Sequence, residues 1–177
     1  ESAEGELLKL IPAMTQSDQK ELLRLAGKQM LSWGITTAHD AVVKPSDLLT
    51  YQAMLREGSL LVRTGMMVIN VVAKEGGSYS AGELTDVRLA LATAGIQAGL
   101  GNDWLWMVGQ KIIADGAFTG RTAAMSEPYE GAPVPESSPQ YRGLLHYPPE
   151  QIKQFIREAH AAGLRPCIHA QGDYGQC

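Results

Sequence analysis

Polar residues that could carry chemistry occur where four apolar segments of the chain end. In chain order they are His39 and Asp40; Asn70; Lys111, Asp115 and Gly116; and His169, Gln171 and Asp173. In parallel α/β folds, functional residues lie at the carboxyl ends of the strands. We therefore expect these side chains to share one site.

Lys111 is the most informative of these residues, because it lies inside the apolar run 104–114. A buried ammonium group is costly, so it needs a compensating interaction. An ion pair, for example with Asp115, is one solution. Reaction with CO₂ to form a carbamate, an anion able to bridge two metal ions, is another. On spacing alone, an ion-paired or snorkelling lysine is the simpler interpretation.

His169 and His39 are candidate metal ligands, since a neutral imidazole binds zinc and similar metals well. A hydrogen-bonded structural histidine is an equal alternative for both. Asp40 follows His39 and could orient its ring. The chain has no His-x-His, His-Glu-x-x-His or Cys-x-x-Cys pattern, so spacing by itself supports a metal site only weakly. It also has no Gly-x-Ser-x-Gly pattern, which removes support for a serine hydrolase.

Composition places the chain among ordinary globular proteins. It has 177 residues, of which 45% are hydrophobic and 19% charged, enough for one domain with a sizeable core. The net charge of -4 argues against a nucleic-acid partner, and no apolar run is long enough to span a membrane. Two cysteines are too few for a disulfide scaffold, so we expect a reducing, cytoplasmic setting.

Hydrophobic periodicity predicts alternating strands and helices. The expected helices are 4–11, 15–33 with Ser17 as N-cap, 45–57, 81–98 and 148–162, and the expected strands are 35–38, 60–73, 104–114 and 165–169. This alternation requires parallel strands joined by crossover helices. The stretch 117–147 is rich in proline and glycine and is expected to be a long functional loop.

Two architectures fit such an alternation, a doubly wound sheet and a (β/α)₈ barrel. No Gly-x-Gly-x-x-Gly follows the first strand and no P-loop is present, which favours the barrel. Four βα units make half of a barrel, and half a barrel exposes two unpaired edges. We therefore expect residues 1–177 to be one segment of a longer barrel domain, able to form homo-oligomers through its edges.

Three strings in the sequence resemble a known family. Lys-Ile-Ile-Ala-Asp-Gly-Ala at 111–117, with Gly-Arg-Thr-Ala at 120–123 and Glu-Pro-Tyr at 127–129, closely resembles a signature of amidohydrolase family 3. That family contains the YtcJ-like hydrolases and the N-substituted formamide deformylases. His-Ala-Gln-Gly-Asp at 169–173 resembles its later His-Ala-x-Gly-Asp motif, and 34–41 is similar to its Gly-Ile-Thr-Thr segment.

The resemblance implies a metal-dependent hydrolase on a TIM barrel, of which this chain would form roughly strands two to five. It implies a divalent metal, zinc by expectation, held by Lys111 as a carboxylated lysine and by His169. The site residues expected on this basis are Lys111, His169 and Asp115 as catalytic residues, and Gly116, Arg121, His39 and Asp173 in the substrate pocket.

The reaction implied is hydrolysis of an amide-like C–N bond, other than a peptide bond, in a small molecule. The family's His-x-His, its later metal histidine and its proton-shuttling aspartate are absent from this chain, so the isolated segment is expected to be inactive. Two alternatives stay open. One is a non-catalytic binding or scaffold module, and the other is a barrel enzyme that uses Lys111 as a Schiff base or general base.

Overall fold

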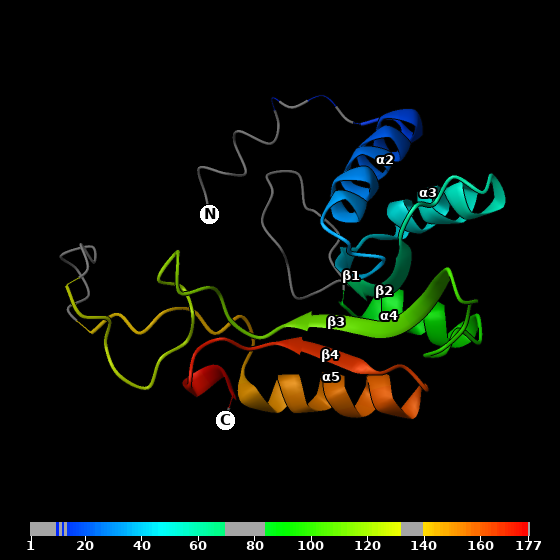
Figure 1. Cartoon of the computed structure of the whole chain (residues 1–177). Helices are drawn as coiled ribbons and strands as arrows, with labels where there is room; N and C mark the ends of the chain where they lie inside the picture. The colour runs from blue at the N-terminus through cyan, green and yellow to red at the C-terminus, as the bar shows by residue number, and fades with distance from the viewer. Residues whose placement is uncertain (1–9, 11, 13, 70–83, 132–139, 177) are drawn as a thin grey trace.

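The computed structural model of the chain describes residues 10, 12, 14–69, 84–131 and 140–176. Strands and helices alternate along it (Figure 1). The elements in chain order are α2 (Gln16–Ser32), β1 (Thr37–Val43), α3 (Pro45–Arg56), β2 (Arg63–Ile69), α4 (Leu84–Thr93), β3 (Leu105–Ile113), α5 (Pro149–Ala161), β4 (Pro166–His169) and a 3₁₀ turn (Tyr174–Gln176). This order confirms the expected α/β class.

The four strands form one parallel sheet in the order β1-β2-β3-β4. A doubly wound sheet would show a reversal of strand order at a switch point. Strands that follow one another in sequence order are instead the arrangement found around a (β/α)₈ barrel. The sheet therefore agrees with the expected partial barrel of parallel strands and crossover helices.

The crossover helices pack on one face of the sheet. Tyr51 of α3, Leu91 of α4 and Ala159 of α5 belong to one buried cluster with Val68 and Met107 of the sheet. Figure 1 shows α5 lying along β4. Each large apolar side chain buried in this way contributes about 1.5–3 kcal/mol to folding. No helix in the described part of the chain is long and apolar enough to cross a membrane.

The first long helix begins at a different residue from the one expected. Its N-cap is Thr15 and not Ser17. The Thr15 side chain accepts a hydrogen bond from the Asp18 amide (3.2 Å), and the Asp18 carboxylate accepts one from the Thr15 amide (2.8 Å). This reciprocal capping box satisfies two backbone donors, which Ser17 with Lys20 could not do.

Several helix and strand boundaries in the structure also differ from the expected ones. β1 begins at Thr37 and continues to Val43, whereas a strand over 35–38 was expected. The other strands and α5 lie within the expected segments, and α4 ends at Thr93, before the expected position 98. The expected helix 4–11, the end of the strand 60–73 and Asn70 fall largely outside the residues that the structure describes.

Among the residues that the structure describes, the buried side chain of Gln110 in the helix-covered layer has no hydrogen-bond partner. Gln110 of β3 is 1% exposed, and neither its amide nitrogen nor its amide oxygen forms a hydrogen bond. A buried amide without partners costs free energy that an apolar side chain of similar length would not.

We therefore predict that Gln110→Met raises the free energy of unfolding by about 1–2 kcal/mol, measured by urea denaturation. The control is Gln52→Met on the exposed surface of α3, which should change stability by less than about 0.5 kcal/mol. A loss of stability in Gln110→Met would contradict the prediction and indicate a water molecule bridging the buried amide.

Candidate active site

The strand register brings Lys111 and His169 to the same face of the sheet. Lys111 pairs with Cys167, and Ile113 pairs with His169, the last residue of β4. Because side chains alternate between faces along a strand, residues two apart share a face. A strand spacing of about 4.8 Å and a two-residue step place the Lys111 and His169 Cα atoms about 8 Å apart. The two expected metal ligands therefore lie on neighbouring strands, at the carboxyl edge.

This shared face is the one turned away from the helices. Ile112, next to Lys111 in β3, packs on the opposite face against Phe155 of α5. Burial raises the pKa of the Cys167 thiol, while the positive charges of Arg165 and Lys111 oppose that rise. The charge of Lys111 therefore acts on the pKa of Cys167, the residue paired with it in β4. Both residues lie on the face that would line the interior of a barrel.

His169 is oriented by a backbone hydrogen bond. Its Nε2 atom lies 2.8 Å from the carbonyl oxygen of Gly116, and its side chain is 29% exposed. Because a carbonyl oxygen only accepts, Nε2 is the nitrogen that carries the proton. The neutral ring then has its lone pair on Nδ1, which is the arrangement of histidines that bind metals through one nitrogen and are oriented through the other.

Asp115 is fully enclosed and does not reach the open face. Its carboxylate is 0% exposed and accepts backbone hydrogen bonds from Ala124 (2.9 Å), Gln171 (2.9 Å) and Gly172 (2.7 Å). No ion pair joins it to Lys111, although His169 Nε2 lies 3.8 Å from one of its oxygens. Asp115 therefore lies as a brace between two loops, and its expected catalytic role stays a prediction.

The glycines of the family-like strings 111–117 and 169–173 allow backbone segments to approach closely. A Cβ atom at Gly116 would overlap the Thr122 side chain, and one at Gly172 would overlap the Ala124 carbonyl oxygen. Gly116 thus contributes through its backbone carbonyl, which orients His169. Thr122, whose hydroxyl accepts from the Ala117 amide (3.0 Å), was not singled out from the sequence.

Asp173 attaches the motif after β4 to the long loop, and its expected place in the substrate pocket stays a prediction. Its carboxylate accepts hydrogen bonds from the Ser126 amide (2.8 Å) and from the Ser126 hydroxyl. The hydroxyl contact, more than the amide contact, lowers the pKa of Asp173 below its ordinary value. Gln171 adds a second tether, since its side-chain oxygen accepts from the Phe118 amide (3.1 Å). Nothing in the single sequence marked Ser126 as the partner of Asp173.

Arg121 lies on the turn that follows β3, close to Gly116. It is exposed and has a positive φ of 51°, and its amide donates to the Phe118 carbonyl oxygen (3.0 Å). The structure therefore places Arg121 on the same loop as the residues that orient His169.

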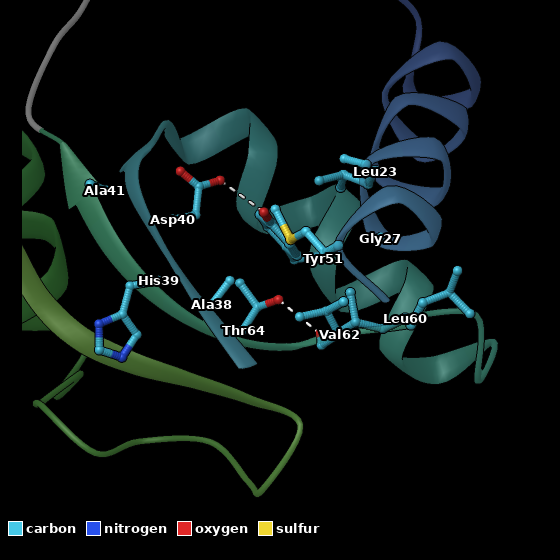
Figure 2. Close-up of a pocket in the computed structure, with 13 residues that line it drawn as sticks. Leu23, Gly27, Ala38, His39, Asp40, Ala41, Tyr51, Leu60, Val62 and Thr64 are labelled. Carbon is cyan, nitrogen blue, oxygen red and sulfur yellow. Dashed lines mark hydrogen bonds between the residues drawn. The ribbon is translucent and has the colours of Figure 1, made fainter. Parts of the chain in front are cut away.

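His39 and Asp40 do not join this group. Asp40 accepts a hydrogen bond from the Tyr51 hydroxyl (2.8 Å) on the helix side of the sheet, while the His39 ring points away from this pair (Figure 2). The His39 ring packs edge-on against Trp106. Burial, with the charge of Asp40, raises the pKa of Tyr51. Asp40 therefore does not orient His39, in contrast to our expectation.

The position of His39 along the sheet also separates it from the site. His39 pairs with Gly65, and Gly65 pairs with Trp106, five residues before Lys111. At about 3.3 Å per residue, His39 lies roughly 15 Å from the level of Lys111. The expectation of His39 in the pocket rested on a strand ending at residue 38, whereas β1 continues to Val43.

A cavity of about 330 Å³ lies between α2, β1, α3 and the start of β2 (Figure 2). Apolar side chains such as Leu23, Leu60 and Val62 form much of its lining, and the Asp40–Tyr51 pair is its polar part. Neither Lys111 nor His169 lines it. The cavity is therefore distinct from the face on which the candidate ligands lie.

The donor set for a metal is incomplete within the described part of the chain. No three His, Cys, Asp or Glu side chains there are close enough to hold a metal ion. His169 offers Nδ1 and Lys111 offers its amine, so these two residues could supply only part of a metal centre.

Comparison with known proteins finds one matching family model and one similar curated protein. The model of the amidohydrolase family matches residues 1–175. The curated protein "Putative amidohydrolase YtcJ" of Bacillus subtilis (strain 168) is 38% identical over 63 residues, which are 36% of this chain and 11% of that protein.

Two solved structures share the fold. An uncharacterized metal-dependent hydrolase from Pyrococcus furiosus gives a TM-score of 0.77 at 24% identity, over 99% of this chain and 33% of that one. An uncharacterized metal-dependent hydrolase from Pyrococcus horikoshii OT3 gives 0.71 at 24% identity, over 92% and 29%. The chain thus spans a third or less of the length of these relatives.

The brace formed by Asp115 leads to a stability prediction. Asparagine has the same shape, but its NH₂ group would face at least one of the three backbone N–H donors in either orientation. We predict that Asp115→Asn lowers the free energy of unfolding by about 2–4 kcal/mol, and that the amides of Ala124, Gln171 and Gly172 exchange faster with solvent.

Denaturant unfolding and amide hydrogen exchange measure these two effects. Asp103→Asn, at an exposed aspartate ahead of β3, is the control and should leave both unchanged. Normal stability and normal exchange in Asp115→Asn would show that the carboxylate is not a brace.

The tether between Asp173 and Ser126 should depend on pH. Because the pKa of Asp173 is lowered in the folded chain, its contribution to stability is present above the unfolded pKa and is lost as the pH falls through the folded value. We predict that the pKa of Asp173 is lower in the folded chain than in the unfolded chain and that Ser126→Ala moves it upward. An NMR titration of the Asp173 carboxyl carbon measures this; an unchanged pKa in Ser126→Ala would refute the tether.

Proposed function

Because this chain belongs to the amidohydrolase family, in its family 3 group, we propose that it supplies part of the active site of a metal-dependent hydrolase. The reaction proposed is hydrolysis of an amide-like C–N bond, other than a peptide bond, in a small molecule. One observation carries the proposal: Lys111 and His169 share the helix-free face of the sheet, at the edge where α/β enzymes place their catalytic groups.

The activity is proposed for a longer protein, of which this chain is one segment of the barrel. The solved relatives are about three times as long as the part that this chain matches. Two donors do not complete a metal site, so the remaining ligands and the proton-transferring aspartate would come from other strands. On this account the 177-residue chain alone binds metal weakly and does not turn over substrate.

His169 would contribute one metal ligand with a fixed tautomer. The hydrogen bond from Nε2 to the Gly116 carbonyl oxygen holds the ring and directs the lone pair of Nδ1 away from the loop. Asp115 keeps Gly116 in place by joining the loop after β3 to the motif after β4. The position of His169 therefore depends on a carboxylate that itself does not touch the substrate.

Lys111 would act as a carbamate. Its neutral amine adds to CO₂, a proton leaves to solvent, and the product carries a negative carboxylate-like group in place of the ammonium. This change removes the cost of a cation among apolar neighbours and creates two oxygen donors. A bound divalent metal, zinc in our proposal, would polarise the scissile carbonyl group and lower the pKa of water.

The test uses the full-length enzyme that contains this segment. We predict that Lys111→Ala and His169→Ala each reduce metal content and lower kcat/KM for amide hydrolysis at least about a hundredfold. The matched controls are Lys153→Ala and His160→Ala on the exposed side of α5, which should leave both quantities unchanged.

Metal analysis and steady-state kinetics provide the readouts. Full activity and metal content in Lys111→Ala would overturn the proposal, as would Lys111-dependent turnover by the isolated 177-residue chain. Borohydride inactivation that requires a carbonyl substrate and Lys111 would instead support a Schiff-base enzyme.

A further inference from the structure

The cavity between α2, β1, α3 and the start of β2 lies between helices that are fixed to each other. The buried Thr50 hydroxyl of α3 donates a hydrogen bond to the side-chain oxygen of Gln19 in α2 (2.6 Å). Lys20 of α2 also forms an ion pair with Glu57, which follows α3 (2.5 Å). The cavity of about 330 Å³ is therefore part of the fold, and its volume lies within the range of about 300–1,000 Å³ that is usual for ligand pockets.

Most of the cavity wall is apolar. Leu23 and Met30 come from α2, and Leu60 and Val62 come from the segment that leads into β2. In Figure 2, Leu23 and Leu60 lie to the right of Tyr51, and Asp40 lies to its left. The cavity can therefore enclose an apolar group next to a charged one.

The carboxylate of Asp40 gives the cavity its negative charge. Asp40 is half-buried, and its two oxygens accept one hydrogen bond each, from the Tyr51 hydroxyl (2.8 Å) and from the Val42 amide (3.1 Å). A carboxylate has about four acceptor positions, so two remain for a further donor. Within the described part of the chain, Asp40 takes part in none of the ion pairs.

Tyr51 does not neutralise this charge. Burial, and then the charge of Asp40, raises the pKa of Tyr51, so its hydroxyl keeps the proton and donates to Asp40 at neutral pH. A neutral donor leaves the negative charge of the carboxylate in place. Because apolar neighbours screen a charge poorly, a carboxylate in this position attracts a cation more strongly than it would in water.

We infer that this cavity binds primary amines with a compact apolar body, with the ammonium group on Asp40 and the body between α2 and the segment before β2. An ammonium group has three N–H donors and no acceptor, which matches the open positions of the carboxylate. The site goes beyond the proposed hydrolase function. It lies on the helix side of β1, away from the face that holds Lys111 and His169.

The test uses the full-length enzyme that contains this segment, with isotope-labelled methionine methyl groups, and two probes of nearly the same shape. Benzylamine is a cation at neutral pH, and benzyl alcohol is neutral. Benzylamine should shift the NMR signal of Met30, which lines the cavity, and leave that of Met125, on the loop after β3, in place. It should bind at least about tenfold more tightly than benzyl alcohol.

Two variants separate the charge from the cavity. Asp40→Asn keeps the shape, and the Tyr51 hydroxyl can rotate to accept from the new NH₂ group, so the fold should persist. In this variant the two probes should bind equally. Ala26→Leu fills part of the cavity from α2 with a good helix former and should weaken the binding of both probes. Asp103→Asn, at an exposed aspartate ahead of β3, is the control and should retain the preference for the amine.

Three outcomes would overturn the inference: equal affinity of the two probes in the original enzyme, an unchanged preference for the amine in Asp40→Asn, or a shift of Met125 without one of Met30. The last would place the amine on the loop near the candidate active site. Lys111→Ala should bind benzylamine with unchanged affinity, because Lys111 lies on the opposite face of the sheet. The amine site and the hydrolase proposal can therefore fail independently.

Discussion

The buried carboxylate of Asp115 is the interaction on which the candidate site depends. A charge can be enclosed in a protein only if polar groups replace the water that it loses. Here the replacements are three backbone N–H groups, one from Ala124 and two from Gln171 and Gly172. Because these donors belong to two separate loops, satisfying the charge fixes the loops to each other and holds the Gly116 carbonyl against His169.

A register shift in the sheet decides which residues face the site. Met66 pairs with Met107, but its neighbour Met67 pairs with Gly109, so β3 contains one extra residue at this point. An extra residue reverses the alternation of side chains beyond it. Trp106 and Lys111, an odd number of positions apart, therefore both lie on the helix-free face, and Lys111 shares that face with His169.

The family-like strings of this chain thus divide into two kinds of residue. Asp115, Asp173 and the glycines hold backbone segments together, and they act on the chemistry only by fixing positions. Lys111 and His169 lie on the open face and can meet a metal or a substrate directly. A short motif of this type serves folding and catalysis at once, because the loop that forms the site must also be held at the end of the sheet.

The sequence by itself determined the alternation of strands and helices and the parallel sheet, because periodicity is a local property. Its resemblance to a family singled out Lys111 and His169 as candidate ligands. The sequence did not show that Asp115 is enclosed, since its partners Gln171 and Gly172 lie more than fifty residues away. Nor did it exclude His39, because the extent of β1 depends on pairing with β2. Only the tertiary structure decides such points, since burial and strand pairing arise between segments that are distant in the chain.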